Sequence, residues 1–409
     1  MFGKRAKPER IEDVRRAVEK KRAGGGKESP KKRGRARTVA IAAAIALILG
    51  GVVIFCLRDY INFYGIKKLF SAFDVGNYGS SSVETIELSY DSALSPLFLA
   101  QRDGLYVATG NRITIKSYQN KELYDEMISL MSPAAADRGK YTLIYDRGGR
   151  ELRLFSDHTL RYRGASEHEL LAADVNSKGE LAFVTKADGY RTMVTVTDEK
   201  QNDIYRWYSA ERYLSAVALS ESGEEFCAVS LMGSSGDVES RLSFSSIRED
   251  EPGAQVSLPG ELIFDISYKN NGSVTAITDQ ALYVFTRDGE LVSKYEYGDR
   301  VLQYFDISSE DHTALVLGNH VYGTETSLVV LDNSLKVVSD GEVGSEVDAI
   351  SADGRRILLT SGESILVFNA YGDRLDTVDL PRGTRKLIQN EEMGAYAILI
   401  DRAVPVSTK

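Results

Sequence analysis

A unit of about 41 residues recurs along most of the chain and limits the possible folds more than any other feature of the sequence. Each unit holds several short apolar or alternating runs, separated by turns rich in Gly, Asp, Asn and Ser. The first runs of successive units begin near Leu97, Ser132, Leu171, Ser215, Leu262, Gln303, Val347 and Leu387. A period of this length is typical of a β-propeller, in which each repeat forms one blade.

The stretch 351–380, SADGRRILLTSGESILVFNAYGDRLDTVDL, shows how one unit is built. The turn at Asp353-Gly354 precedes the apolar runs ILLT and ILVF, and the turn around Gly372 precedes the polar run RLDTVDL. The central strands of a blade pack on neighbouring blades with both faces, so they should be apolar, whereas the outermost strand borders solvent. The sequence therefore predicts an all-β, eight-bladed propeller. A ring of seven blades with a divergent end is the alternative.

The last unit is one strand short. From Leu387 onward there is room for about three strands, LIQ, AYAILI and AVPVS. A spare strand-like segment, VETIELSY at 83–90, precedes the first unit. We expect this segment to complete the last blade, so that the propeller domain covers 83–409.

The N-terminal region has a different character. Residues 38–57, TVAIAAAIALILGGVVIFCL, contain no charged side chain, and as a helix they would span roughly 30 Å, the thickness of a bilayer core. The preceding residues 1–37 carry 15 Lys/Arg and 5 Asp/Glu. Because positive flanks stay in the cytoplasm, we expect a single-pass membrane protein with a cytoplasmic tail, a connector at 58–82 and an extracytoplasmic propeller. A cleaved signal peptide would have a shorter apolar region and a shorter basic region.

The blade-like stretch QRDGLYVATGNRITIKSYQNKELYDEM at 101–127 resembles the blades of WD40-like and quinoprotein-like propellers. The whole plan, a basic tail, one span and a propeller, resembles an uncharacterised family of membrane-anchored propellers in Firmicutes. That resemblance implies a fold and a cell-membrane location but no activity. The Trp-Asp dipeptide of WD40 repeats is absent, and Trp207 is the only tryptophan, so a quinone cofactor is not implied.

The sequence offers little for catalysis. The four histidines, His158, His168, His312 and His320, form no pair at metal-ligand spacing. Cys227 lies in the apolar run FCAVSL and should be an inert core thiol, and the second cysteine, Cys56, falls in the predicted span. We therefore predict no catalytic, metal or cofactor-binding residues. After residue 37 the chain has 35 Lys/Arg against 54 Asp/Glu, which argues against binding to nucleic acid.

Three segments should form unusual loops on one rim: the Gly/Ser-rich 232–240, the stretch 318–326, and the aromatic junction 207–213. Aromatic side chains are favoured at interfaces, so we hypothesise one binding patch made of Trp207, Tyr208, Tyr213, His320 and Tyr322. Simple packing of these residues between blades is the alternative. The expected function is a scaffold or sensor that binds an envelope protein, peptide or glycan. The alternative function is an envelope polysaccharide hydrolase or lyase with an acidic site in the central channel.

Overall fold

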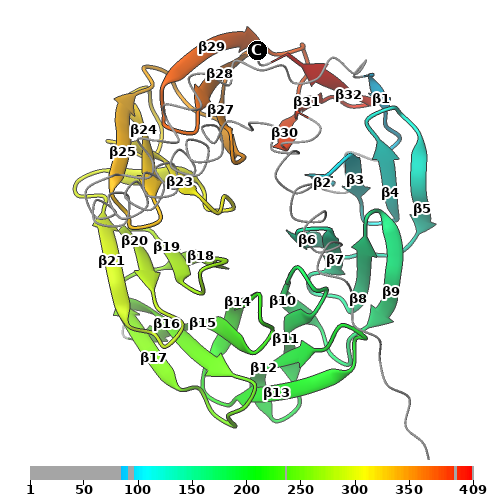
Figure 1. Ribbon diagram of the computed structural model, residues 1–409, viewed down its shortest axis with the longest axis vertical. Coiled ribbons are helices and arrows are strands. Elements are labelled where there is room, and N and C mark those ends of the chain that lie inside the picture. Colours follow the sequence, from blue (N-terminus) through cyan, green and yellow to red (C-terminus); the bar gives the residue numbers. More distant parts are fainter. Residues whose placement is uncertain (1–83, 91–95, 235–236, 391–393, 408–409) are drawn as a thin grey trace, which may run out of the picture. The chain divides into compact units, whose positions relative to one another are not determined.

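A computed structural model describes residues 84–90, 96–234, 237–390 and 394–407. Within these ranges the regular elements are antiparallel strands, which form eight four-stranded sheets. The sheets are arranged as blades in a ring around a central opening (Figure 1). The predicted eight-bladed propeller is confirmed, and the seven-bladed alternative is wrong.

The first strand of each blade lies nearest the central opening and the fourth lies at the circumference (Figure 1). Blade 1 contains β2 (Leu97–Gln101), β3 (Gly104–Ala108), β4 (Arg112–Ser117) and β5 (Glu122–Met127). Blade 2 contains β6 (Pro133–Arg138), β7 (Tyr141–Asp146), β8 (Glu151–Ser156) and β9 (Thr159–Ala165). Blade 3 contains β10 (Leu170–Val175), β11 (Leu181–Ala187), β12 (Tyr190–Thr197) and β13 (Asp203–Ser209). Blade 4 contains β14 (Tyr213–Leu219), β15 (Glu225–Ser234), β16 (Asp237–Ser246) and β17 (Ala254–Pro259).

The second half of the ring repeats this order. Blade 5 contains β18 (Ile263–Tyr268), β19 (Val274–Thr278), β20 (Ala281–Phe285) and β21 (Leu291–Glu296). Blade 6 contains β22 (Val301–Asp306), β23 (His312–Gly318), β24 (Thr326–Asp332) and β25 (Val337–Glu342). Blade 7 contains β26 (Ala349–Ala352), β27 (Arg356–Ser361), β28 (Ser364–Asn369) and β29 (Arg374–Asp379). Blade 8 combines β30 (Lys386–Asn390), β31 (Gly394–Ile398) and β32 (Arg402–Val406) with β1 (Ile86–Glu87).

Burial within a blade follows the expected order. In blade 7 the two central strands, β27 and β28, are buried along their middle residues, while the outer strand β29 is almost wholly exposed. The central strands are apolar because the neighbouring blades cover both of their faces. The propeller therefore has no single centre of packing, and its core is divided among the interfaces between blades.

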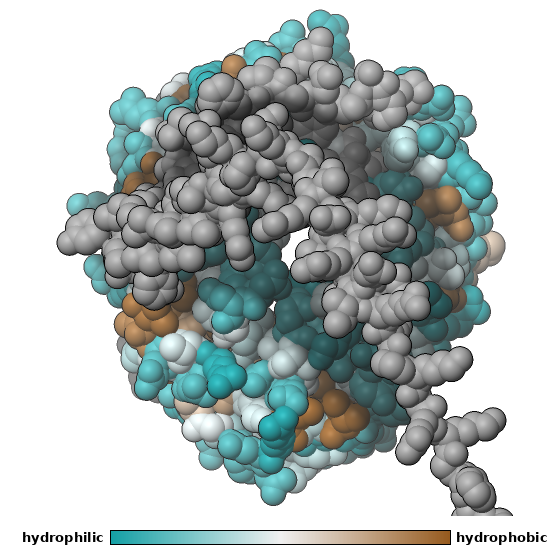
Figure 2. Space-filling model, viewed as in Figure 1, coloured by the Kyte–Doolittle hydropathy of each residue, from teal (hydrophilic) through white to brown (hydrophobic). Residues whose placement is uncertain are grey.

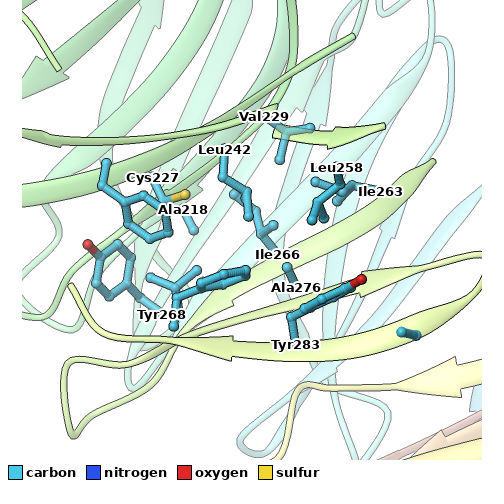
Figure 3. Packing of buried hydrophobic residues seen from close by; sticks show 14 residues of the cluster. Ala218, Cys227, Val229, Leu242, Leu258, Ile263, Ile266, Tyr268, Ala276 and Tyr283 are labelled. Carbon is cyan, nitrogen blue, oxygen red and sulfur yellow. The ribbon is translucent and has the colours of Figure 1, made fainter. Parts of the chain in front are cut away.

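The interface between blades 4 and 5 illustrates this packing. Leu242 and Cys227 of blade 4 lie in one cluster with Ile266, Tyr268 and Tyr283 of blade 5, and these side chains meet between the two sheets (Figure 3). Cys227 is a free, fully buried thiol, and burial raises its pKa, which keeps it in the unreactive thiol form. Its predicted position in the core is confirmed.

The ring closes through residues from opposite ends of the domain. Strand β1 pairs antiparallel with β32, with Ile86 opposite Ala403 and Glu87 opposite Arg402. Ile86 is fully buried and packs in a cluster with Phe98 of blade 1 and residues of blade 8. Strand β1 thus supplies the fourth strand that the last blade lacks, as predicted from the spare segment before the first unit.

The predictions for the N-terminal region and for the loop 232–240 have different outcomes. The predicted tail, span and connector at 1–82, and with them Cys56, lie outside the described residues. Within the described ranges, no helix has the length and apolar character needed to cross a bilayer.

The predicted loop 232–240 is wrong, because β15 and β16 continue as a ladder through Met232 opposite Glu239 to Ser234 opposite Asp237. Backbone pairing in this long hairpin outweighs the weak strand preference of its Gly and Ser residues.

Candidate functional site

One end of the ring carries both the hairpins between second and third strands and the links from each blade to the next; we call it the link rim. The junction between β13 and β14 and the hairpin between β11 and β12 both lie at this rim. Loops held at the rim of a rigid scaffold are common positions for binding residues. The predicted site residues fall at this end of blades 3, 4 and 6.

Tyr208 and Tyr213 lie at this rim with two residues that the sequence reading missed. The rings of Tyr190 and Tyr208 lie 4.8 Å apart at an angle of 41°. The guanidinium of Arg191 lies 5.0 Å from the centre of the Tyr213 ring, and its Nη1 donates a 2.8 Å hydrogen bond to the Tyr213 hydroxyl. We call Tyr190, Arg191, Tyr208 and Tyr213 the aromatic shelf. The three tyrosines are 48%, 41% and 54% exposed, so the shelf offers ring surface to solvent.

Strand register explains why these residues meet. A two-residue turn, Asp188-Gly189, joins β11 to β12, and Gly189 has a φ of +78°, which favours glycine. In the ladder between β12 and β13, Met193 lies opposite Tyr208. Tyr190 and Arg191 therefore project beside the end of β13 and the start of β14. The Asp188-Gly189 pair could have predicted this position from the sequence. It marks the hairpin between the second and third strands of blade 3, which lies at the same rim as the junction between β13 and β14.

Trp207 does not belong to the exposed surface. It is 9% exposed and packs in the core between blades 3 and 4 with Leu214 and Phe226. Successive residues of a strand point to opposite faces, so Trp207 turns toward blade 4 while Arg206 and Tyr208 turn the other way. Trp207 therefore packs between blades, which was the alternative to a role in a binding patch.

His320 and Tyr322 lie in the 319–325 hairpin of blade 6. Both side chains are exposed, Tyr322 by 79%, and the His320 carbonyl accepts a 2.7 Å hydrogen bond from Gln303 Nε2. Blade 5 lies between blade 6 and Tyr213 of blade 4, and among the described residues no hydrogen bond or ring contact joins His320 or Tyr322 to the aromatic shelf. The structure therefore places Tyr208 and Tyr213 at the same junction, each against a residue of the β11–β12 hairpin, and places His320 and Tyr322 on a separate part of the rim.

The coloured atoms that can be seen beside the central opening are mainly hydrophilic (Figure 2). Two of its carboxylates, Asp174 and Asp306, come from inner strands. Asp174 accepts the amide hydrogens of Val175 (2.9 Å) and of Leu219 in the next blade (2.8 Å). Asp306 accepts the amide of Ala352, also in the next blade, at 2.8 Å. These contacts tie adjacent inner strands together, which is a structural use of the acids.

The end of the channel opposite the link rim is crossed by Arg138. This side chain comes from blade 2, yet its Nη1 lies 2.5 Å from Glu310 of blade 6 and its Nη2 donates a 2.9 Å hydrogen bond to the Tyr268 carbonyl of blade 5. Its Nε lies 3.4 Å from Glu221 of blade 4. Nearby, Lys269 donates to the carbonyls of Ile307 and Ser309, and burial lowers its pKa to about 8. Four blades thus meet in one charged network.

Burial raises the pKa of Asp174 to about 6, although the carboxylate accepts hydrogen bonds from two backbone amides.

Of the histidines, His158 pairs with Tyr106 and Asp103 in the turn after β8, and His312 lies buried beside Ser309. Across the described ranges, His, Cys, Asp and Glu residues form no group of three or more arranged to hold a metal. The strongest feature for recognition is therefore the aromatic shelf.

Comparisons with known proteins agree with this fold. Residues 80–404 match a family described as "Family of unknown function (DUF5711)", and the chain belongs to that family. Among solved structures, the C-terminal WD40 domain of Sif2 is similar with a TM-score of 0.55 and 9% identity, covering 79% of this chain and 99% of that one. BamB from Moraxella catarrhalis has a TM-score of 0.47 and 11% identity, covering 80% and 98%. No curated protein matches the sequence. At 9% identity, the similarity to the Sif2 domain shows the propeller fold alone.

Proposed function

We propose that this member of the family of unknown function is a non-enzymatic binding scaffold that presents the aromatic shelf to a partner at the cell envelope. The observation that carries the proposal is the exposure of three tyrosines on one rim, two of them packed on each other and the third packed against Arg191. Tyr and Arg are enriched at binding hot spots, because they offer large contact areas with few flexible torsions. An envelope protein, peptide or glycan is the expected kind of partner.

The proposed location rests on the sequence. The uncharged segment 38–57 and the basic residues before it support a single span with a cytoplasmic N-terminus and an extracytoplasmic propeller. A reporter enzyme that is active only outside the cytoplasm, fused after Lys409, tests this topology. Activity of the fusion supports it, and a fusion that is stable but inactive contradicts it.

The binding role is tested by truncating the shelf. A Tyr190→Ala/Tyr208→Ala variant should lose about tenfold or more in partner capture after cross-linking in cells. Leu375→Ala, an exposed apolar residue on β29, is the control for nonspecific effects of surface truncation. Tyr322→Ala shows whether blade 6 contributes to the same partner. Capture that is unchanged in the double variant, with an unchanged melting temperature, refutes the role of the shelf.

A hydrolase or lyase acting in the channel is the second candidate. The raised pKa of Asp174 favours it, since a carboxyl that titrates near 6 can serve as a general acid. Asp174→Asn should abolish any release of reducing sugar from envelope polysaccharide if the channel is catalytic. In a scaffold, the same variant keeps full partner capture.

A further inference from the structure

A pocket of about 300 Å³ lies between blades 2 and 3. Its walls come from the third and fourth strands of blade 2 and from the second, third and fourth strands of blade 3. This volume lies at the lower end of the range for small-molecule sites. The residues that matter for its chemistry are Tyr162, Phe183, Thr185, Thr195, Thr197 and Arg206.

The two faces of blade 3 differ in chemistry. The face toward blade 4 is apolar, with Val184, Val194 and Val196 in the core. The alternate residues, which line the pocket toward blade 2, include Thr185 and Thr195. Threonines in place of valines on a buried sheet face are costly unless their hydroxyls find partners. Hydroxyls gathered at a cavity therefore favour a polar ligand.

The hydroxyls are not all used within the protein. Thr197 accepts a hydrogen bond from the Leu181 amide at 3.2 Å and donates to Gln201 Oε1 at 3.1 Å. Thr185, which is 1% exposed, has no hydrogen-bond partner for its hydroxyl within the described part of the chain. Buried polar groups nearly always have a partner, so this hydroxyl is available to a group that enters the pocket.

The rest of the lining combines aromatic rings with one arginine and two carboxylates. Tyr162 and Phe183 supply ring surface. Arg206 Nη2 lies 2.6 Å from Asp203 Oδ2, and its Nη1 lies 3.9 Å from Glu167. Because both carboxylates of the lining lie beside its one cation, the pocket does not favour an anionic ligand. Rings, hydroxyls and an Arg–Asp pair suit a neutral molecule with many hydroxyl groups and an apolar ring face.

The pocket leads to the aromatic shelf. Arg206 and Tyr208 lie two residues apart on one face of β13, and the Tyr208 hydroxyl interacts with the Arg206 side chain. Met193 lines the pocket and lies opposite Tyr208 in the ladder, while Tyr190 packs on Tyr208. A ligand longer than the pocket would therefore continue along these rings.

We propose that the pocket between blades 2 and 3 binds one sugar unit of an oligosaccharide, and that the aromatic shelf binds the units that follow. This inference rests on the proposed binding function and names its ligand class. Tyrosine faces match the C–H surface of sugar rings, and threonine hydroxyls match their hydroxyl groups. A peptide, the other occupant with a similar shape, has no comparable need for a hydroxyl-lined end pocket.

The test uses the full-length chain, purified in detergent, with N-acetylglucosamine, chitotetraose, glucose and cellotetraose as probes. Isothermal calorimetry and saturation-transfer NMR measure binding. Tyr162→Leu removes an aromatic ring from the pocket wall while keeping apolar bulk, and should weaken binding of every sugar that binds the parent. Thr185→Val keeps the side-chain shape and should weaken binding about three- to tenfold, with a melting temperature that is unchanged or higher. Tyr208→Ala should weaken the tetrasaccharide and leave the monosaccharide unaffected.

The outcomes distinguish a failure of the sugar site from a failure of the proposed scaffold function. If no probe binds, or if Tyr162→Leu and Thr185→Val bind like the parent, the sugar site is refuted. If cross-linked capture of a protein or peptide still depends on Tyr190 and Tyr208, the scaffold function stands without the sugar site. If neither capture nor sugar binding depends on these residues, both proposals fail.

Discussion

Replacing Ile86 with alanine should open the ring at its closure. Ile86 belongs to the two-residue strand β1 and is fully buried in the cluster that joins blades 8 and 1. Truncating a buried isoleucine to alanine costs about 2–5 kcal/mol. For a domain of more than 300 residues, the specific unfolding entropy converts this cost to a loss of roughly 3–8 °C in melting temperature.

The matched control is Glu87→Ala, in the same strand. Glu87 keeps its backbone pairing with Arg402 in this variant, and exposed substitutions usually change stability by about 0.5 kcal/mol or less. Differential scanning calorimetry on the full-length chain measures both variants. If Ile86→Ala melts within about 1 °C of the parent, β1 does not hold the ring closed and the argument from its burial is refuted.

A cysteine pair gives an independent check of the same closure. Glu87→Cys and Arg402→Cys place thiols on directly opposed residues, whose Cα atoms in an antiparallel pair lie about 4.5–5.5 Å apart. That separation suits a disulfide. The oxidised double variant should migrate as an internally cross-linked chain on a non-reducing gel and melt at a higher temperature than its reduced form.

The remaining predictions address the core, the channel network and pH. Trp207→Ala should lower stability by about 3–5 kcal/mol, because Trp207 fills the core; urea unfolding measures this loss, and an unchanged midpoint would place Trp207 on the surface. Arg138→Met should lower the free energy of unfolding by about 1–3 kcal/mol, because Glu310 loses its charged partner. Adding Glu310→Gln should restore part of this loss in a double-mutant cycle. If the effects of the two substitutions simply add, the contact across the channel is contradicted. Because the pKa of Asp174 is raised in the folded state, this residue stabilises the fold below its unfolded pKa near 4, and the stabilisation is lost as pH rises through about 6. Asp174→Asn should therefore reduce the change in melting temperature between these two pH values. A pH profile that is the same in the variant and the parent would contradict the raised pKa.

The sequence was sufficient to predict the fold because every blade repeats the same local chemistry. The eight predicted unit starts lie within two residues of the first strands, from Leu97 for β2 to Leu387 for β30. The turns, the apolar central strands and the polar outer strands are all local features, so they can be recognised without knowing the ring. Loop 232–240 failed because its strand character comes from pairing across a long hairpin.

The candidate site was only partly predictable for two physical reasons. Trp207 was assigned to a junction, so the strand alternation that buries it was not applied. The grouping of Tyr208 with His320 and Tyr322 required the positions of blades 3 and 6 in the ring, which no local pattern encodes. Arg138 makes the same point, since its partner Glu310 is 172 residues away in sequence.

The pairing of β1 with β32 has a consequence for synthesis. Because a ribosome makes Ile86 before Ala403, β1 has no partner until on the order of 300 further residues have been added. At typical rates of chain elongation this delay is roughly 15–60 s. During that time seven blades can form in order, but the last interface stays open, with unpaired strand edges that could join another chain. The short length of β1 limits how much edge the growing chain exposes while it waits.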